Sequence, residues 1–282
     1  MTSVVIPVYN AAAVLDVTGP AALALCDVAE IVWVDDGSSD GTAERLDSLA
    51  QADRRARVLR FPTNRGRSAA RNAGARVTAG DVIVFLDVDV EPGPDAAGRL
   101  ADAVGTGVAS VARVRPVPDR PAEPYQDYAA HHPRGPSGGL RAGHPVDWRF
   151  FLAGACAVRR DAFEREGGFR EDVAYGEDVA LACALRTTSP RGLRLADAVV
   201  RLHDVGDLPR ALRHSASFGE ALRAFGADCP DLTRRFRRAA PLGVLPSAPL
   251  RWAVDALPPG AARRRAVRSL LALAALRAYR RA

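Results

Sequence analysis

Two aspartates separated by one residue, Asp87 and Asp89, follow the apolar run 82–86. A continuous apolar run of this length is typical of a parallel strand buried on both faces, and open α/β sheets bind ligands at the carboxyl ends of such strands. Alternate residues at a strand end point the same way, so both carboxylates could bind one divalent cation that carries substrate phosphates. Because Asp-x-Asp is a short motif, a strand that simply runs into an acidic turn is the alternative interpretation.

Other carboxylates also lie at the ends of predicted strands or at the start of a predicted helix. Asp35 and Asp36 follow the apolar run 31–34, and Glu177 and Asp178 stand where a helical segment begins. The carboxyl ends of parallel strands meet at one edge of a sheet, so we expect these side chains to converge there. Such convergence is what a site for a metal ion and phosphates requires.

The segments that must position these carboxylates alternate between strands and helices. Alternation of this kind predicts an α/β protein with a Rossmann-like, doubly wound, mostly parallel sheet. We expect strands at 3–8, 31–34, 58–61, 82–86, 108–114 and 151–158, an edge strand at 199–203, and helices at 41–51, 66–77, 93–104, 177–185 and 208–225.

Two stretches depart from this alternation. Residues 116–147 are rich in Pro and Gly, which predicts a long irregular loop with one helical turn near 125–130. Loops of this length are usually functional or disordered. A Pro-rich linker at 241–259 precedes a final helix that starts at Ala261. We therefore divide the chain into an α/β body, 1–232, and a basic C-terminal extension, 233–282.

The composition is ordinary for a soluble globular protein, since 48% of the 282 residues are hydrophobic and 26% are charged. The first residues lack the pattern of a signal peptide. The apolar run 270–276 falls far short of the roughly 20 residues that span a bilayer. We therefore expect a cytoplasmic protein without a membrane span.

Cysteine and lysine usage excludes several classes of site. The four cysteines, Cys26, Cys156, Cys183 and Cys229, show none of the spacings of a zinc site or a disulfide framework, so we expect reduced, mostly buried thiols. No lysine occurs, and all 39 basic residues are arginine. This excludes a P-loop and argues against a phosphoacceptor receiver domain, whose chemistry relies on lysine. Residues 36–47 nearly match an EF-hand calcium loop, but a strand precedes them where that motif needs a helix.

Several short motifs follow one another in a fixed order. They are VVIPVYN at 4–10, VDDGSSDGT at 34–42, NRG at 64–66, ARNAG at 70–74, GDVIVFLDVD at 80–89, GAC at 154–156, GGF at 167–169, GED at 176–178 and His203. This series, which covers residues 3 to 220, resembles the family 2 glycosyltransferases of the GT-A fold. The resemblance implies an inverting, metal-dependent glycosyltransferase that moves one sugar from a nucleotide-diphospho-sugar, with UDP favoured, to an acceptor hydroxyl.

The resemblance also implies nucleotide-binding residues. The matching positions are Pro7, Tyr9 and Asp36 for base and ribose, and Arg71 and Asp87 for further nucleotide contacts. Asp36 would accept a hydrogen bond from a base N–H, or alternatively would only form the turn that follows it. Arg71 would contact the nucleotide, or alternatively would be a solvated charge, as we expect for Arg65, Arg67 and Arg76 beside it.

Metal-binding and catalytic residues follow from the same resemblance. Asp89 and His203, with Asp87, would bind Mn²⁺ or Mg²⁺ that bridges the donor diphosphate. Glu177 and Asp178 match the catalytic pair, with Asp178 as the base that deprotonates the acceptor hydroxyl. The alternative roles are helix capping for Asp178 and a purely structural role for His203.

Two features depart from the family pattern. Val90 stands where a further aspartate is common and is followed by Glu91, which weakens the metal assignment. No Gln-x-x-Arg-Trp motif follows Asp178, which favours transfer of a single sugar over polysaccharide synthesis.

The C-terminal extension is strongly basic, because residues 233–282 hold 12 Arg and one Asp. Apolar residues at helical spacing lie between these arginines: Val267, Leu270, Leu271, Ala274 and Ala278. A basic amphipathic helix can lie on an anionic membrane, here the inner face of the cell membrane, and would bring the protein to a lipid-linked acceptor. Packing of this helix on the body is the alternative. Interleaved aromatic residues are lacking, so we expect no nucleic-acid partner.

A second hypothesis comes from another functional class. The chain could be a non-catalytic nucleotide-sugar-binding or membrane-associated scaffold protein of the same fold. The joint presence of Asp87, Asp89 and Asp178 argues against it.

Overall fold

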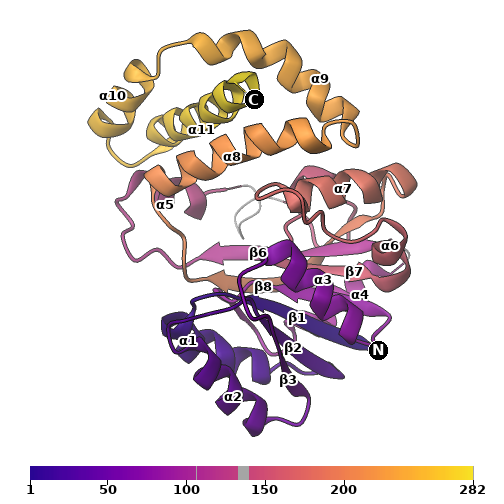
Figure 1. Cartoon of the computed structure of the whole chain (residues 1–282). Coiled ribbons are helices and arrows are strands. Elements are labelled where there is room, and N and C mark those ends of the chain that lie inside the picture. Colours follow the sequence, from indigo (N-terminus) through magenta and orange to yellow (C-terminus); the bar gives the residue numbers. More distant parts are fainter. Residues whose placement is uncertain (106, 133–139, 282) are drawn as a thin grey trace.

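One mixed sheet runs through the part of the chain that the computed structural model describes, residues 1–105, 107–132 and 140–281 (Figure 1). Its eight described strands lie in the order β3-β2-β1-β4-β7-β6-β8-β5. The strands are β1 (Thr2–Val8), β2 (Glu30–Asp35), β3 (Ala56–Arg60), β4 (Val82–Leu86), β5 (Val90–Pro92), β6 (Ala109–Pro116), β7 (Ala155–Arg159) and β8 (Leu193–Leu202).

Pairing in the sheet is mostly parallel. Strands β3, β2, β1 and β4 are parallel neighbours, and β8 is parallel to β6. Strand β7 is antiparallel to both β4 and β6, and β5 is antiparallel to β8. The predicted α/β class, with a mostly parallel sheet and helices following it at the C-terminus, is confirmed.

Helices cover both faces of the sheet, and the last four gather above it (Figure 1). The helices are α1 (Ala12–Leu23), α2 (Thr42–Ala52), α3 (Arg67–Val77), α4 (Ala96–Val104), α5 (Pro124–Ala130), α6 (Arg160–Arg165), α7 (Glu177–Thr188), α8 (Leu208–Phe225), α9 (Pro230–Ala239), α10 (Ala248–Ala256) and α11 (Ala261–Arg281), with 3₁₀ turns η1 (Trp148–Phe150) and η2 (Ala240–Val244).

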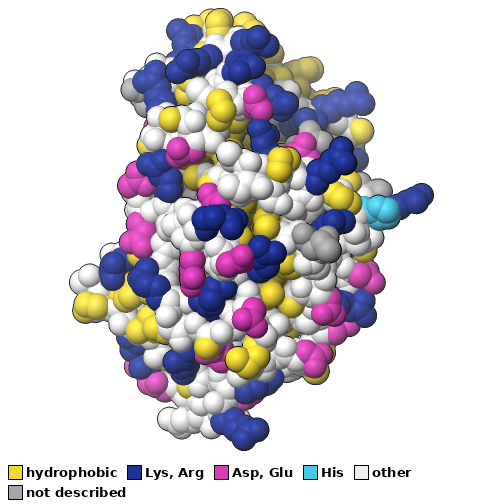
Figure 2. All heavy atoms as spheres, turned by 90° about the vertical axis from the view of Figure 1, so that its right-hand side faces the viewer, with side chains coloured by type: hydrophobic (Ala, Val, Ile, Leu, Met, Phe, Trp, Pro, Cys, Tyr) yellow, Lys and Arg dark blue, Asp and Glu magenta, His cyan; other side chains and the backbone are white. Residues whose placement is uncertain are grey.

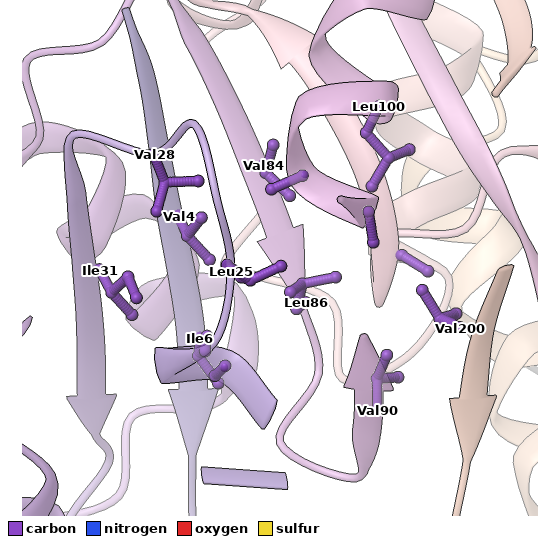
Figure 3. Close-up of a cluster of buried hydrophobic side chains, with 14 of the residues drawn as sticks. Val4, Ile6, Leu25, Val28, Ile31, Val84, Leu86, Val90, Leu100 and Val200 are labelled. Atoms are coloured by element: carbon purple, nitrogen blue, oxygen red, sulfur yellow. The ribbon is translucent and has the colours of Figure 1, made fainter. Parts of the chain in front are cut away.

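The central strand β4 shows why the apolar run 82–86 is continuous. Val84 and Leu86 belong to the cluster of buried side chains in Figure 3, which α1, α2 and α4 cover. Ile83 and Phe85 point to the opposite face and pack under α3, α6 and α7. Because side chains alternate across a strand and both faces are covered, every position of the run is apolar.

Several predicted boundaries differ from the structure. Strand β7 begins at Ala155, after η1, where the sequence predicted a strand from 151. Strand β8 is not at the edge, because β5, a strand too short to recognise from sequence, pairs with it. The predicted helical turn near 125–130 is α5; residues 133–139 of the predicted loop lie outside the described residues. The predicted linker 241–259 contains the end of η2 and all of α10.

The expectation that all cysteines are reduced is wrong for two of them. Cys183 of α7 and Cys229, just before α9, form a disulfide, with their Cα atoms 5.5 Å apart. Cys26, which is exposed, and Cys156, which is buried, are free thiols. The pair escaped sequence analysis because only the packing of the C-terminal helices against α7 brings these residues together.

Helix α11 packs on the protein through the apolar residues that suggested a membrane-binding face. Val267, Leu270 and Ala278 are buried, and Val267 and Leu270 pack against apolar side chains of α8 and α10. The N-terminal arginines of α11 are also engaged, since Arg264 donates to the carboxylate of Asp127 in α5 over 3.1 Å. The apolar face predicted for lipid contact is therefore covered, and the alternative, packing on the body, is the observed one.

Within the described ranges, none of the helices is long and apolar enough to cross a bilayer.

Close approach of α8 and α11 depends on Gly219. A Cβ atom at this position would lie 2.0 Å from the carbonyl oxygen of Ala275, a backbone atom of α11. We therefore expect Gly219→Ala to lower the free energy of unfolding by about 1–3 kcal/mol, because the helices must move apart. Chemical denaturation of the purified protein measures this difference.

Gly98 of α4 provides the matched control, because a Cβ there would meet its nearest atom at an ordinary 3.5 Å. Gly98→Ala should raise the free energy of unfolding by up to about 1 kcal/mol through its better helix propensity. Equal effects of the two substitutions would contradict the close packing of α8 on α11.

Candidate functional site

The turn between β4 and β5 carries both aspartates of the Asp-x-Asp motif. The backbone N–H of Asp87 donates to the carbonyl oxygen of Gly154 over 3.0 Å, which ties the turn to the residue before β7. A Cβ atom on residue 154 would lie only 2.2 Å from Oδ2 of Asp87. Glycine at this position therefore leaves room for the carboxylate.

Arg71 of α3 connects this turn to the start of α7. Its guanidinium donates to Oδ1 of Asp87 and, over 3.0 Å, to Oε1 of Glu177. The side chain of Arg71 is only 2% exposed, and its Cζ lies 5.3 Å from the ring centroid of Phe169. The structure thus brings three of the predicted site residues into one buried bridge, and the solvated charge considered for Arg71 is wrong.

The positive charge of Arg71 is stabilised by the carboxylates of Asp87 and Glu177. Burial by itself lowers the pKa of Arg71, but the negative charges of Asp87 and Glu177 outweigh burial and raise this pKa above its ordinary value. Arginine suits the position because its rigid fork of N–H donors can serve two carboxylates at once.

Glu177 and Asp178 are neighbours with different surroundings. Glu177 is buried, and besides its contact with Arg71 it forms an ion pair with Arg67, whose Nε lies 2.8 Å from Oε1 of Glu177. Asp178 is partly exposed, and its Oδ1 accepts the N–H of Val179 over 2.8 Å. The N-terminus of α7 favours negative charge at this point. Glu177 therefore anchors the helix, and Asp178 presents a carboxylate at its N-terminus.

His203 lies beside the second aspartate of the motif. Because β5 pairs with β8, the backbone N–H of His203 donates to the carbonyl oxygen of Asp89 over 2.9 Å. Nε2 of His203 lies 2.5 Å from Oε2 of Glu91. Glu91, which follows the Val90 that departs from the family pattern, therefore orients the imidazole ring.

The carboxylate of Asp89 is crowded by other negative groups. Burial, followed by the charges of Asp87 and Asp204, raises the pKa of Asp89 to about 7. Within ranges 1–105, 107–132 and 140–281, no group of three or more His, Cys, Asp or Glu is arranged to hold a metal ion. The two carboxylates of Asp87 and Asp89 would suit Mg²⁺ or Mn²⁺, because such an ion can bind to one or two carboxylates and complete its coordination with substrate phosphates and water.

The residues predicted to hold the nucleotide line the ends of β1 and β2. Pro7 is buried within β1, and Tyr9 just beyond it is 49% exposed. Asp36 is buried, and its two carboxylate oxygens accept the N–H groups of Arg65 and Gly66 over 2.6 and 2.8 Å. Asp36 thus holds the loop before α3, and each oxygen retains a second lone pair that a base N–H could use.

Sequence analysis missed a stacked cluster beside Glu177. The guanidinium of Arg67 lies 4.4 Å from the ring centroid of Tyr175, whose ring lies 4.5 Å from that of His214 in α8. The interpretation of Arg67 as a solvated charge is therefore wrong. Its spacing of four from Arg71, which places both on one helix face, was the available signal.

This cluster makes α8 a border of the site. Burial raises the pKa of Tyr175 to about 12. Burial, and then the positive charges of Arg210 and Arg67, lower the pKa of His214 to about 4, so its imidazole is neutral at pH 7. Arg210 also donates to Asp204 over 2.5 Å, close to Asp89. The α8 side of the site is therefore polar and partly cationic.

Comparison with known sequences identifies related proteins. The family model described as "Glycosyl transferase family 2" matches residues 3–167. The chain is 39% identical over 120 residues to undecaprenyl-phosphate 4-deoxy-4-formamido-L-arabinose transferase of Pseudomonas aeruginosa (strain LESB58), a match that spans 41% of this chain and 35% of that protein. It is 37% identical over 93 residues to an uncharacterized glycosyltransferase of Haemophilus influenzae, spanning 32% of this chain and 36% of that one. The chain thus spans about a third of the length of these relatives.

Solved structures share the fold over almost the whole chain. Mannosyltransferase PcManGT from Pyrobaculum calidifontis, in complex with GDP-Man and Mn²⁺, has a TM-score of 0.60 and 22% identity, covering 99% of this chain and 85% of that one. Residues 1–349 of S. aureus TarS in complex with UDP have a TM-score of 0.60 and 15% identity, covering 99% and 90%. The same fragment is also known in complex with UDP-GlcNAc. These likenesses confirm the GT-A fold.

The bridge through Arg71 predicts a large loss of stability when it is removed. Arg71→Met removes the arginine that pairs with Asp87 and leaves Glu177 with Arg67 as its remaining cation, and breaking a buried ion pair in this way costs about 3–5 kcal/mol. Arg76→Met, an exposed position on the same helix, is the control and should change the free energy of unfolding by less than about 0.5 kcal/mol. Urea denaturation measures both, and similar values for the two variants would refute the bridge.

The raised pKa of Asp89 predicts that the free energy of unfolding depends on pH when EDTA keeps the protein free of metal. An ordinary aspartate has a pKa of about 4, so between about pH 4 and 7 the folded protein holds a proton on Asp89 that the unfolded chain releases. The free energy of unfolding therefore falls over this window as pH rises, and the penalty is complete above pH 7.

Asp89→Asn removes this penalty. We expect it to raise Tm, by more at pH 8 than at pH 5.5, whereas Asp102→Asn, at an exposed position, should leave Tm unchanged at both. A Tm increase for Asp89→Asn that does not grow with pH would contradict the assigned environment.

Proposed function

Because the chain belongs to glycosyltransferase family 2, we propose that it transfers one sugar from a nucleotide-diphospho-sugar donor to an acceptor hydroxyl, with inversion at the anomeric carbon. One observation carries the proposal: Arg71 joins the turn with Asp87 and Asp89 to the helix end with Asp178. Carboxylates for donor and acceptor chemistry are thereby held at one edge of the sheet. We take residues 1–232 as the catalytic body and 233–282 as its extension.

The donor lies across the ends of β1, β2 and β4 in this proposal. Tyr9 is exposed where it can pack on a nucleotide base, Asp36 accepts a base N–H, and Asp87 contacts the ribose. Buried Arg71 acts through Asp87, which it orients. Structural neighbours bind UDP, UDP-GlcNAc and GDP-Man, which supports a nucleotide-sugar donor, and UDP remains the favoured nucleotide.

Asp89 and Asp87 are the residues that would hold Mn²⁺ or Mg²⁺, with His203 beside them. The Mn²⁺ complex of a neighbour of the same fold supports this assignment. When bound by these residues, a divalent cation would supply positive charge that stabilises the diphosphate leaving group. Glu91 keeps the His203 ring in place.

Asp178 is the general base. Its carboxylate takes the proton of the acceptor hydroxyl while that oxygen forms the new bond to the anomeric carbon. The diphosphate leaves from the opposite side with the electrons of the old bond, which inverts the configuration. Glu177 positions Asp178 by fixing the first turn of α7 on Arg71 and Arg67.

The acceptor is lipid-linked in this proposal. Several related proteins are undecaprenyl-phosphate 4-deoxy-4-formamido-L-arabinose transferases, which supports a lipid carrier. The protein would then work peripherally at the cytoplasmic face of a membrane. The scaffold hypothesis is less well supported, because a scaffold has no need of a base held at Asp178.

Replacing the base tests the proposal. Asp178→Asn should lower the transfer rate by about 10²–10⁴, because the amide cannot take the hydroxyl proton. The measurement is release of nucleoside diphosphate in the presence of a lipid-linked acceptor. Unchanged transfer would remove Asp178 as base and would point to an acceptor oxygen that is already ionised.

The control for this variant is donor binding. UDP with Mn²⁺ should raise Tm equally in the wild type and in Asp178→Asn, since ligand at a hundredfold over its Kd adds about 2.7 kcal/mol to the stability. GDP, dTDP and CDP give the base preference in the same assay. Absence of any shift in the wild type would favour the scaffold hypothesis.

A further inference from the structure

The segment formed by η2 and α10 leaves large apolar side chains in contact with solvent. Leu242, Val244, Leu245 and Trp252 are 53%, 68%, 50% and 70% exposed. The other exposed large apolar residues of the described chain are dispersed along it: Met1, Tyr9, Val17, Val77 and Val199. Apolar side chains that gather at the surface mark an interaction site more often than single ones do.

The packing below this segment holds those side chains outward. Arg277 of α11 donates to the carbonyl oxygens of Gly243 and Leu245 over 3.1 and 2.6 Å, and to Oγ of Ser247 over 3.3 Å. Helix α10 buries Val254, which lies roughly opposite Trp252 on the helix. The backbone and the inner face are therefore fixed, and the exposed face is a stable feature of the fold.

Unpaired arginines border these apolar side chains. Arg280 and Arg281 line a cleft of about 620 Å³ together with Val244, and Arg251 precedes Trp252 in α10. None of these three arginines forms an ion pair with a carboxylate in the described chain. Asp255 is the one acidic residue in 233–282.

A second basic cleft lies nearby on the same group of helices. It measures about 820 Å³ and is lined by Arg223, Arg234 and Arg237. In Figure 2, dark blue side chains accordingly predominate at the top of the molecule, where the C-terminal helices lie, with hydrophobic side chains among them.

We define the η2–α10 surface as Leu242, Val244, Leu245, Arg251, Trp252, Arg280 and Arg281. An anionic lipid bilayer matches both parts of it, because tryptophan and aliphatic side chains enter the headgroup region and arginines attract anionic lipids. A second copy of the chain would set unpaired arginines against arginines. A nucleic acid would pair with the arginines but leave the aliphatic side chains uncovered.

We propose that the η2–α10 surface docks the protein on anionic membranes, with Trp252 and Leu245 at headgroup depth. The apolar contact thus comes from η2 and α10, and α11 contributes only its terminal arginines. The purpose of docking, access to a lipid-linked acceptor, rests on the proposed function, but docking itself needs neither donor nor metal.

Tryptophan fluorescence of the full chain tests this contact. Trp33 and Trp148 are 1% and 5% exposed, so Trp252 is the tryptophan that solvent and lipid can reach. Vesicles of phosphatidylglycerol and phosphatidylcholine should shift the emission to the blue and protect it from acrylamide, and brominated lipids should quench it. Vesicles of phosphatidylcholine alone should bind at least tenfold more weakly.

Substitutions at exposed positions separate the two parts of the surface. In vesicle sedimentation, Leu245→Ser with Trp252→Ser should weaken binding at least tenfold, and Arg251→Gln, Arg280→Gln and Arg281→Gln by roughly fivefold each. Val77→Ser and Val199→Ser, at exposed apolar positions elsewhere, should bind like the wild type. Unchanged Tm values show that each variant is folded.

Emission of Trp252 that does not respond to anionic vesicles overturns the proposal, as does wild-type sedimentation of the Leu245/Trp252 variant. Binding of duplex RNA that depends on the same arginines, without vesicle binding, would assign the surface to nucleic acid. A dimer that the Trp252 substitution abolishes would assign it to a second copy. Variants that lose vesicle binding but keep the Tm shift with UDP and Mn²⁺ show that docking and donor binding are independent properties.

Discussion

The buried guanidinium of Arg71 is the interaction on which the arrangement of the site depends. It lies between Asp87, at the end of β4, and Glu177, at the start of α7. Arg71 and Glu177 are both buried and would each be costly to bury without an opposite charge, so the bridge stabilises the two charges together. The turn that carries the Asp-x-Asp motif and the helix end that carries Asp178 are consequently fixed relative to each other, although they come from distant parts of the chain.

The bridge can form because α3 lies very close to the sheet. A Cβ atom at Gly74 would lie 2.3 Å from Cγ1 of Val5, so a glycine is needed where α3 crosses β1. Asn72 secures the other side of α3, since its amide donates to the carbonyl oxygen of Phe169 over 2.8 Å and its Oδ1 accepts the N–H of the same residue over 2.9 Å. Phe169 then packs against the guanidinium, so apolar and polar contacts of one helix together set the position of Arg71.

Helix α7 links the site to the C-terminal helices. The disulfide from Cys183 to Cys229 joins it to the start of α9, and a Cβ at Gly176 would lie 2.9 Å from the ring of Phe218 in α8. Helix α8 in turn borders the site and supports α11. The helices that present the η2–α10 surface are therefore part of the same packed unit as the proposed base, which allows membrane docking to fix the orientation of the site toward a lipid-linked acceptor.

The sequence by itself determined the alternation of strands and helices, the acidic strand ends and the family, because periodicity, apolar runs and short motifs are local properties of the chain. Only the tertiary structure decided which partner each side chain meets. Arg67 and Arg76 look alike in sequence, yet packing places one beside Glu177 and leaves the other in solvent. The apolar residues of α11 fit a membrane face or a protein core equally well, and the position of α8 made them core. Contacts between side chains of distant segments depend on how the helices pack on the sheet, and a short stretch of sequence does not specify that packing.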